Sequence, residues 1–580
     1  MQELNTFILL LALTIHVATG QFDTGMTGDR RVVVQLFEWP FDDIREECRN
    51  ILGPQKFGAV LVSSVTENAA FEINLNGRSV RPWYERYQII SWDIRSRLGT
   101  EQQFKSMVEE CNKHDVRVYV DAVFNHGVSS TLFDGEVVGA AGTHANVKTK
   151  TYPGLGYKSE NFHKACPMDF DDRIAVRVCE LEHLQDVNQT QPYVQDKIVS
   201  FLNKLIDFGV AGFRIDAAKH MWPEDLLNIY SSLKNVSLND GKTQMRPIWM
   251  LENFDDDGLY QEDYKDIASE YDFAFQRLVT AVIKNGVKNM SSIHTYAKNP
   301  IYKSKTRQDF GTNHDLQRVF WDGYWEAPNI SEVQQTINSF MLTFSRETPN
   351  IFSGYSYAVT EGAIGPPSDR WFNIISPQNC TDGWMCDHRY KSLIWIIKYF
   401  TNFVQDAPVE SWWSEWPNGT PYQAAFTRGQ KGFAVFNADT EPLHHTFQVP
   451  LPAGVYCDLA TGFYCHDRRT CVGSDGMERK VEVKEDGTLE VTLPGMTRHA
   501  KSLDVGTESF SQPPYIVISL QSMYPTEEDT NTSIIETLSL TSMNFVVGAA
   551  FGVVAAVVVL VGSCLLRRQF KSRKDVGEEL

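Results

Sequence analysis

The sequence predicts an α/β fold: a (β/α)8 TIM barrel with an insertion domain on its rim, followed by an all-β antiparallel C-terminal domain and one transmembrane helix. Three observations support this prediction. Short apolar runs alternate with amphipathic helical stretches, polar residues follow the ends of several apolar runs, and the pattern changes near residue 410. The chain has 580 residues, too many for one ordinary core, so we expect several domains.

The candidate barrel strands are short and rich in β-branched residues. They cover Val32–Phe37, Ala59–Ser63, Val116–Asp121, Gly212–Asp216, Ile248–Glu252 and approximately Asp309–Thr312. Between them, apolar residues recur at helical spacing, as at Phe104, Met107, Val108 and Cys111. A second helical face carries Val194, Ile198, Phe201, Leu202, Leu205 and Ile206. A doubly wound open sheet would alternate in the same way, but no glycine-rich phosphate loop follows the first strand, so we favour the barrel.

The alternation of strands and helices breaks twice along the chain. Residues 127–190 are glycine-rich and polar, which indicates an insertion on the barrel rim between the first part of the barrel (21–126) and the second (191–409). From 410 to 520 the pattern changes to short alternating strands, which predicts a separate antiparallel β-domain. Candidate strands there are Gly432–Asn437, Thr446–Val449 and Thr488–Leu493.

Both ends of the chain carry apolar segments. Phe7–Val17, followed by the small residues 18–20, is typical of a secretory signal peptide over residues 1–20; a buried N-terminal strand is the alternative. Phe545–Leu566 contains no charged residue and is long enough to cross a hydrocarbon core of about 30 Å. The basic residues that follow place that side in the cytosol by the positive-inside rule. They are Arg567, Arg568, Lys571, Arg573 and Lys574.

These segments predict a single-pass type I membrane protein whose large domain is extracellular or lumenal. A polar stalk would cover 521–544, the transmembrane helix 545–566 and the cytoplasmic tail 567–580. A lipid-anchor signal is the alternative, but such signals end in an apolar tail and this chain ends in charged residues. Ten cysteines agree with an oxidising compartment, although Cys564 lies within the apolar segment. Candidate glycosylation sequons begin at Asn188, Asn235, Asn289, Asn329, Asn379, Asn418 and Asn531.

The charge balance excludes one class of partner. Lys and Arg number 54 against 73 Asp and Glu, a formal net charge of -19. Nucleic-acid binding requires a basic surface, so we do not expect it. Nothing in the sequence indicates an oligomeric state.

Acidic residues close several of the predicted strands. Arg214 and Asp216 lie two residues apart on one strand and therefore on the same face. We expect the guanidinium to keep Asp216 ionised and suited to nucleophilic attack. Glu252 ends an apolar stretch, where desolvation would raise its pKa and make it a proton donor near neutral pH. Asp315 adds a third carboxylate, beside His314.

Together these carboxylates predict a glycoside hydrolase. Two carboxylates in unlike environments around a sugar linkage are what glycoside hydrolysis requires. Taken singly, each acidic residue is more often a surface charge or a helix cap. Each of the three closes a different predicted strand, however, and the C-terminal ends of barrel strands form the active-site rim.

The sequence resembles the animal-type alpha-amylases from about Val32 to Leu520. The segments that carry the resemblance are Asp121–His126, Gly209–Pro223, Glu252, Asn313–Asp315, Arg81–Gln88 and Leu36–Trp39. The resemblance implies that Asp216 is the nucleophile, Glu252 the general acid/base and Asp315 the carboxylate that stabilises the transition state. The implied activity is retaining endo-hydrolysis of α-1,4-glucosidic linkages in starch, glycogen and related α-glucans.

The resemblance also implies binding residues. Trp83, Tyr84 and Tyr87 would stack on sugar rings, and Gln88, His126, Arg214, Lys219 and His314 would contact the glucose units; without the resemblance, the aromatic run would more often be core. Asn125, Arg177, Asp186 and His220 would bind Ca²⁺, the second and fourth through backbone oxygen. Because Ca²⁺ takes six to eight oxygen ligands, such an ion would tie the insertion at 127–190 to the barrel. Turn chemistry is the alternative for Asn125 and Asp186.

Two further features follow from the resemblance. Four disulfides are implied, Cys48–Cys111, Cys166–Cys179, Cys380–Cys386 and Cys457–Cys471, which leaves Cys465 unassigned. Animal amylases of this type bind chloride through two arginines and an asparagine. Arg214 and Asn313 are present, but Asn350 stands in place of the second arginine, so we expect little or no chloride requirement.

Two other functions remain open. One is a membrane-anchored exo-acting α-glucosidase, which would release glucose alone instead of a ladder of maltooligosaccharides. The other is a non-catalytic ectodomain that serves as a partner or receptor, as in amino-acid-transporter heavy chains. Those proteins have type II topology and lack the carboxylates, whereas this chain keeps all three and carries its apolar segment at the C-terminus.

Overall fold

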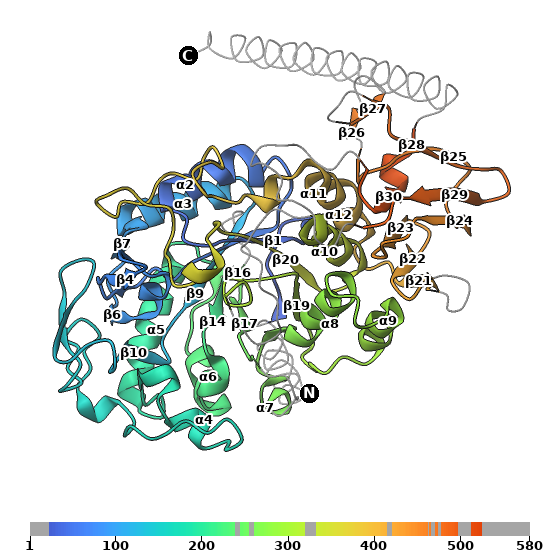
Figure 1. Cartoon of the computed structure of the whole chain (residues 1–580). Coiled ribbons are helices and arrows are strands. Elements are labelled where there is room, and N and C mark those ends of the chain that lie inside the picture. The colour runs from blue at the N-terminus through green and yellow to red at the C-terminus, as the bar shows by residue number, and fades with distance from the viewer. Residues whose placement is uncertain are drawn as a thin grey trace, which may run out of the picture. The chain divides into compact units, whose positions relative to one another are not determined.

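Parallel strands form a closed barrel at the centre of the structure, a computed structural model that describes residues 22–237, 244–254, 260–318, 332–414, 420–461, 463–465, 470–473, 477–496 and 512–524. Within these residues the barrel has eight strands, which follow chain order around it (Figure 1). They are β1 (Val33–Leu36), β2 (Ala59–Val62), β9 (Arg117–Ala122), β14 (Gly212–Ile215), β17 (Ile248–Leu251), β18 (Ser269–Tyr271), β19 (Arg307–Phe310) and β20 (Thr348–Ser353). The predicted barrel is therefore confirmed.

The sequence predicted six of these strands to within two residues and missed β18 and β20. β18 is only three residues long and includes the buried Glu270. β20 contains Pro349 and Asn350, which are rare in central strands. Both strands are nevertheless paired on each side, and Asn350 lies opposite Val33 and Phe310.

Helices surround the barrel. The long ones are α3 (Glu101–Lys113), α5 (Pro192–Asp207), α6 (Pro223–Ser231), α8 (Phe273–Ile283), α9 (Met290–Lys298) and α10 (Glu332–Phe344). Thr100 caps α3 with a capping box, and a proline opens α5 and α6, so local sequence fixes where these helices begin. The apolar faces predicted for α3 and α5 are buried.

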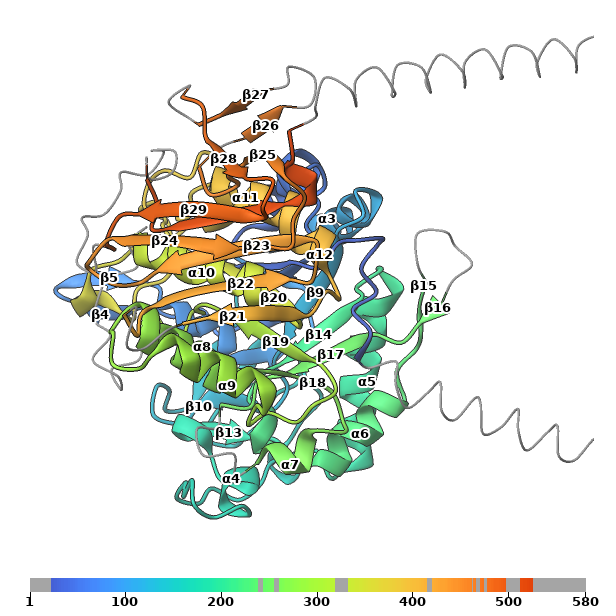
Figure 2. The ribbon, with the colours of Figure 1, turned by 90° about the vertical axis from the view of Figure 1, so that its right-hand side faces the viewer.

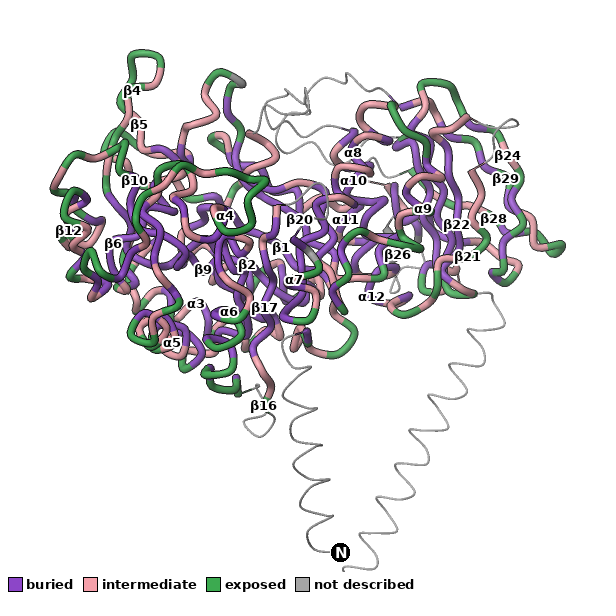
Figure 3. Tube along the Cα trace, turned by 90° about the horizontal axis from the view of Figure 1, so that it is seen from below, coloured by how far each residue is buried: buried purple, intermediate pink, exposed green. Residues whose placement is uncertain are grey.

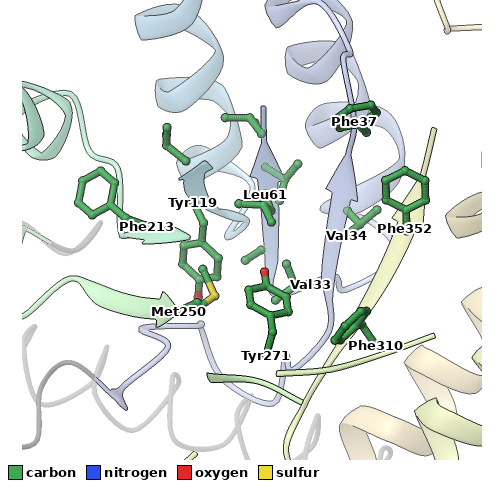
Figure 4. Packing of buried hydrophobic residues seen from close by; sticks show 14 of the residues in the cluster. Val33, Val34, Phe37, Leu61, Tyr119, Phe213, Met250, Tyr271, Phe310 and Phe352 are labelled. Atoms are coloured by element: carbon green, nitrogen blue, oxygen red, sulfur yellow. The ribbon is translucent and has the colours of Figure 1, made fainter. Parts of the chain in front are cut away.

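The core lies inside the barrel and between the barrel strands and the helices that surround them. Figure 3 shows the strands as mostly buried tube, with exposed residues gathered in the loops. Side chains from successive strands pack together there, among them Val34, Leu61, Tyr119, Met250 and Phe310 (Figure 4). This packing holds the strand ends in fixed positions, which is what a site built on the rim needs.

The segment between β9 and α5 forms a small subdomain on the rim. β10 (His126–Ser129) pairs antiparallel with β13 (Leu184–Asp186), and β11 (Glu136–Val138) pairs with β12 (His144–Asn146). The short helix α4 (Ala175–Val178) and the Cys166–Cys179 disulfide complete it. The register His126 to Asp186 brings the two ends of the segment together beside the barrel.

Two antiparallel sheets make up the C-terminal β-domain (Figure 2). The first contains β21 (Val409–Trp413), β22 (Gln423–Arg428), β23 (Gly432–Asn437) and β30 (Tyr515–Ser519). The second contains β24 (Leu443–Gln448), β29 (Thr488–Leu493), β28 (Lys480–Val483) and β25 (Gly454–Cys457). The predicted strands at 432–437 and 488–493 are confirmed, while the one predicted at 446–449 begins earlier, at Leu443. All described residues up to Ser522 belong to one compact unit.

The four predicted disulfides are confirmed, since Cys48–Cys111, Cys166–Cys179, Cys380–Cys386 and Cys457–Cys471 all form. Cys465 lies in β26 (Phe463–Cys465). The predicted signal peptide, transmembrane helix and cytoplasmic tail, and all but the first residues of the stalk, lie outside the described residues. Across the ranges that the structure does describe, no helix is long and apolar enough to cross a membrane.

Candidate active site

The predicted catalytic residues follow neighbouring barrel strands at one rim. β14 pairs with β9 and β17, and Arg214 lies opposite Asp121 in this register. Asp216 and Glu252 each come directly after a paired strand residue, Ile215 and Leu251. Asp315 lies five residues beyond the end of β19 at Phe310. Because all these strands are parallel, their C-terminal ends bring the side chains to the same rim.

A cleft of about 490 Å³ opens at this rim. Its lining includes all three predicted catalytic carboxylates and the predicted sugar-binding residues Trp83, Tyr84, Tyr87, Gln88, His126 and His314. Two other predicted substrate residues do not line it. The ammonium of Lys219 donates to the carbonyl of Phe254, and Arg214 lies in the buried floor among carboxylates.

Arg214 is the electrostatic centre of the site. Its guanidinium contacts Asp121, Asp216 and Glu252, with 3.0 Å between Nη1 and Asp216 Oδ1. Glu252 Oε2 also accepts a hydrogen bond from the Ala217 N–H at 3.1 Å. One buried cation therefore faces three carboxyl groups instead of the single one that the sequence suggested.

Because three carboxyl groups share one guanidinium, the pKa of Asp216 differs from that expected for a single ion pair. Burial raises the pKa of Asp216 well above its ordinary range and repulsion from Glu252 adds to the rise, while Arg214 opposes it. Burial and Glu252 likewise raise the pKa of Asp315 to about 7. For the pKa of Asp216, desolvation therefore outweighs a guanidinium shared by three acids, which is the opposite direction to the one expected from Arg214 alone. That Glu252 is the proton donor stays a prediction.

Tyr87 and His314 connect this cluster to the cleft. The Tyr87 hydroxyl donates to Asp121 Oδ2 at 2.9 Å and lies 2.9 Å from His314 Nε2. That nitrogen also lies 3.2 Å from Asp315 Oδ2, so we assign it the ring proton. Burial lowers the pKa of His314 well below its usual value and that of His126 to about 4. Both imidazoles are thus neutral hydrogen-bonding groups.

The predicted calcium residues converge where the rim subdomain meets the barrel. The Val187 N–H donates to the Asn125 carbonyl at 3.0 Å, and Asp186 pairs with His126. His220 Nδ1 lies 2.8 Å from the carbonyl of Val176, next to Arg177. Asn125 Oδ1 and Asp186 Oδ1 are buried without a hydrogen-bond partner among the described residues. Two orphaned oxygen atoms at this junction fit a hard cation.

An ion at this position would rely on few carboxylates. In the described part of the chain, no group of three or more His, Cys, Asp or Glu side chains could hold a metal. The other oxygen Oδ2 of Asp186 lies 2.6 Å from His163 Nδ1. The predicted set combines this carboxylate with an amide and two backbone oxygens, a mixture that Ca²⁺ accepts.

Sequence reasoning missed part of the cleft. Asp121 was recognised only as part of a motif, although its position at the end of a strand was a usable signal. The wall at Leu181–Leu184 gave no signal. Within this wall, Glu182 and His183 adopt positive φ angles of 48° and 63°. The Ser130 N–H donates a hydrogen bond to the His183 carbonyl at 2.9 Å. Arg318 was also missed; it packs over the rings of Trp83 and Tyr357.

A (β/α)8 barrel with a carboxylate cluster at its C-terminal rim is the arrangement found in barrel-type glycoside hydrolases. Comparison with family models narrows this class. Residues 84–361 match the alpha amylase catalytic domain, and residues 413–500 match the alpha amylase C-terminal all-beta domain. The chain belongs to the alpha-amylase family.

Individual relatives agree with this assignment. The alpha-amylase-related protein of Drosophila pseudoobscura pseudoobscura is 36% identical over 489 residues, covering 81% of this chain and 95% of that protein. The one from Drosophila orena is 36% identical, covering 83% and 94%. Alpha-amylase I from Eisenia fetida, solved as the wild type and as a mutant in complex with maltohexaose, superposes with a TM-score of 0.73 at 26% identity. Those alignments cover 86% of this chain and 99% of the solved chains.

Proposed function

We propose that this chain hydrolyses internal α-1,4-glucosidic linkages of starch, glycogen and related α-glucans with retention of configuration. The observation that supports this best is the contact of Asp216 and Glu252 with one guanidinium, that of Arg214. This contact keeps the two carboxyl groups at short range, and retaining enzymes hold them about 5 Å apart. The relative from Eisenia fetida was solved with maltohexaose, which supports an α-glucan as substrate.

In the first half of the proposed reaction, Glu252 gives its proton to the glycosidic oxygen as the bond from that oxygen to the anomeric carbon breaks. A carboxylate oxygen of Asp216 forms a bond to the same carbon. In the second half, Glu252 removes a proton from water, whose oxygen attacks the anomeric carbon and releases Asp216. Asp315 and the neutral His314 contact the sugar in the strained transition state, where their hydrogen bonds strengthen.

The raised pKa values suit this cycle. Attack requires one ionised carboxylate and one carboxylic acid in the same cleft, so the cluster must hold a proton at neutral pH. Burial raises the pKa of both Asp216 and Asp315, and Arg214 limits the rise. We propose that substrate binding places this shared proton on Glu252.

We also propose that Asn125, Asp186 and the backbone oxygens of Arg177 and His220 hold Ca²⁺. The support is the pair of orphaned buried oxygen atoms on Asn125 and Asp186. A bound cation would supply positive charge that offsets the cost of burying Asp186, whose pKa burial raises to about 7. Its role would be structural, since it would fix β10 and β13 against the barrel beside the cleft.

We propose that the catalytic domain works at the cell surface or in the secretory lumen, anchored by the apolar segment at 545–566. Four disulfides agree with an oxidising compartment. An exo-acting α-glucosidase would make glucose alone, so the products formed from starch distinguish it from the proposed activity. A non-catalytic role as partner or receptor does not explain why the cleft keeps all three carboxylates.

The test is Asp216→Asn in the full chain. The substitution preserves shape but removes the attacking charge, so we expect the rate of starch hydrolysis to fall at least about a thousandfold, with a melting temperature no lower than that of the parent chain. Asp134→Asn, in an exposed loop of the same rim, is the matched control and should keep full activity. An Asp216→Asn chain that retains a tenth of the rate would disprove the assignment.

A further inference from the structure

The turn that carries His314 and Asp315 lies on the catalytic rim, beyond the end of β19. Two internal hydrogen bonds shape this turn. Asn313 Oδ1 accepts from the Leu316 N–H at 2.8 Å, and the Arg318 N–H donates to the Asp315 carbonyl at 2.7 Å. These bonds close the turn on itself, so the position of Asp315 in the cleft depends on contacts with other segments of the rim.

The side chain of Arg318 makes such contacts. Its Nη1 donates to the His314 carbonyl at 2.5 Å, and its Nε donates to the Gly362 carbonyl at 3.2 Å. Gly362 belongs to the segment that follows β20, which is the neighbour of β19 in the barrel. The Tyr357 hydroxyl adds a second link from that segment, because it donates to the Gln317 carbonyl at 2.8 Å. One guanidinium therefore joins the turn after β19 to the segment after β20.

Aromatic rings surround the guanidinium of Arg318. The distances from its central carbon to four ring centroids are 4.6 Å for Tyr357, 5.1 Å for Trp83, 5.4 Å for Tyr355 and 5.6 Å for Phe37. Each lies within the range of about 6 Å over which a cation is attracted to a ring face. The rings and the two hydrogen bonds leave the charged group little freedom to move.

Arg318 is also a positive charge beside the catalytic carboxylates. In the described part of the chain its guanidinium donates to carbonyl groups and forms no ion pair with a carboxylate. Arg214, by contrast, contacts three carboxyl groups. The charge of Arg318 therefore acts on groups beyond contact distance, where a buried site screens it less than water does.

Asp315 is the catalytic carboxyl group that this charge affects. Burial raises the pKa of Asp315 to about 7. Four charged groups face it from β9, from β14, from the end of β17 and from its own turn: two carboxylates that raise the pKa further and two guanidinium groups that lower it, namely Glu252, Asp121, Arg214 and Arg318. The imidazole of His314 and the hydroxyl of Tyr87 are neutral. Without Arg318, one of the two opposing charges is lost and Asp315 would hold its proton more tightly.

Arginine suits this position in a way that lysine does not. A guanidinium is planar and presents its N–H groups in a fixed fork, so it can donate to two carbonyls and stack on rings at the same time. An ammonium group is a point charge on a flexible chain, which would keep the charge but not this set of contacts. The contacts of Arg318 and its charge can therefore be separated by substitution.

We propose that Arg318 is a positioning residue of the active site, which holds the His314–Asp315 turn against the segment after β20 and supplies a second positive charge beside Asp315. Arg318 itself does not line the cleft, so it acts through these two residues. The inference rests on the proposed function, since it assumes that Asp315 stabilises the transition state as a carboxylate. A protonated Asp315 would lose that role, because it carries no negative charge to face the positive charge that develops on the sugar.

The test measures kcat/KM on starch as a function of pH for the full chain and its variants. Arg318→Met removes both the charge and the contacts, so we expect kcat at the pH optimum to fall at least about tenfold. The acidic limb of its profile should move to higher pH by at least about half a unit, because Asp315 ionises at a higher pH. Arg318→Lys keeps the charge, so its acidic limb should stay within about 0.2 units of the parent's while kcat stays at least about threefold lower.

A matched variant tests whether lost stability alone explains these effects. Arg246 stacks on the ring of Tyr230 at 4.6 Å and donates to the carbonyls of Tyr230 and Leu233, so it makes the same kinds of contact as Arg318. None of these three residues lines the cleft. Arg246→Met should therefore lower the melting temperature but leave kcat and the pH profile unchanged at a temperature at which every variant is folded.

Several results would overturn the role of Arg318. Arg318→Met with more than about half of the parent's kcat would show that the turn does not depend on it. An acidic limb that stays in place in Arg318→Met, or moves equally in Arg318→Lys, would show that its charge does not act on Asp315. If Arg318→Met does not fold, Arg318→Gln, which keeps N–H donors, takes its place with the same expected shift. A parent chain that does not hydrolyse starch would refute the proposed function itself, whereas an active parent with unaltered variants would refute only the role of Arg318.

Discussion

Asp387 is a buried carboxyl group outside the catalytic cleft. Its Oδ1 has no hydrogen-bond partner among the described residues, and burial raises its pKa to about 7. In the unfolded chain the pKa would be about 3.9. Because the pKa is higher in the folded state, burial of this carboxyl group costs no free energy of folding below about pH 4. The cost grows as the pH rises toward 7.

Replacing this carboxyl should therefore stabilise the protein in a pH-dependent way. We expect Asp387→Asn to raise the free energy of unfolding at pH 7.5 by at most about 4 kcal/mol, since each pKa unit corresponds to about 1.4 kcal/mol. At pH 4 the gain should vanish. Thermal melting at both pH values measures this, with Asp134→Asn as the exposed control. A gain that is equal at both pH values would contradict the electrostatic explanation.

Asn350 supports a second residue-level prediction, on chloride. Its Nδ2 donates to Gln308 Oε1 at 3.1 Å and to the Thr348 carbonyl at 3.0 Å. Arg214, the remaining arginine of the expected chloride site, already contacts three carboxylates. A further anion would add negative charge to a buried cluster in which three carboxyl groups already share one cation, so we expect chloride to change neither the rate on starch nor its pH optimum. A pH–rate profile in halide-free buffer, with and without added chloride, measures this; many-fold activation would contradict it.

At the scale of elements, the junction of β10 and β13 with the barrel carries the calcium prediction. An ion that binds only the folded state stabilises it by about 3 kcal/mol at a hundred times its Kd. We expect exhaustive chelation to lower the melting temperature and the activity together, and added Ca²⁺ to restore both. Asn125→Ala should lose this sensitivity, whereas Asn74→Ala, an exposed asparagine elsewhere, should keep it. A melting curve that chelation leaves unchanged would rule the site out.

Elements also show where sequence reasoning works. Strands that are buried on both faces appear as apolar runs, so β2 and β17 could be predicted from composition alone. β18 and β20 could not, because they carry Glu270 and Asn350 and are held by pairing with their neighbours. Their polar residues are tolerated because they find hydrogen-bond partners inside the barrel, and such partners are not visible in a linear sequence.

Some features of the candidate site could likewise be predicted from the sequence, and others could not. Asp216, Glu252 and Asp315 could be predicted because parallel strands bring their ends to one rim. The contact of Arg214 with three carboxyl groups could not be predicted, since it depends on side-chain placement across β9, β14 and β17. For the same reason, the pKa of Asp216 is raised, whereas Arg214 alone would lower it.

At the scale of the whole molecule, one compact unit contains the barrel, the rim subdomain and the C-terminal β-domain. Arg428 helps to join the barrel to the β-domain, since its guanidinium donates to the carbonyls of Thr343 at 2.8 Å and Ser345 at 2.9 Å. The catalytic rim and the predicted calcium junction therefore belong to one body. The proposed membrane anchor concerns where this body works and leaves its chemistry unchanged.

Retaining hydrolysis by this chain requires Asp216 to form a covalent bond to the sugar. The most direct measurement incubates the full chain with a fluorinated α-maltosyl fluoride, whose fluorine slows release of the intermediate, and locates the label by mass spectrometry. We expect the added sugar to lie on the tryptic peptide 215–219 and to be absent from the Asp216→Asn chain. A label on another peptide, or turnover of starch with no label at all, would contradict it.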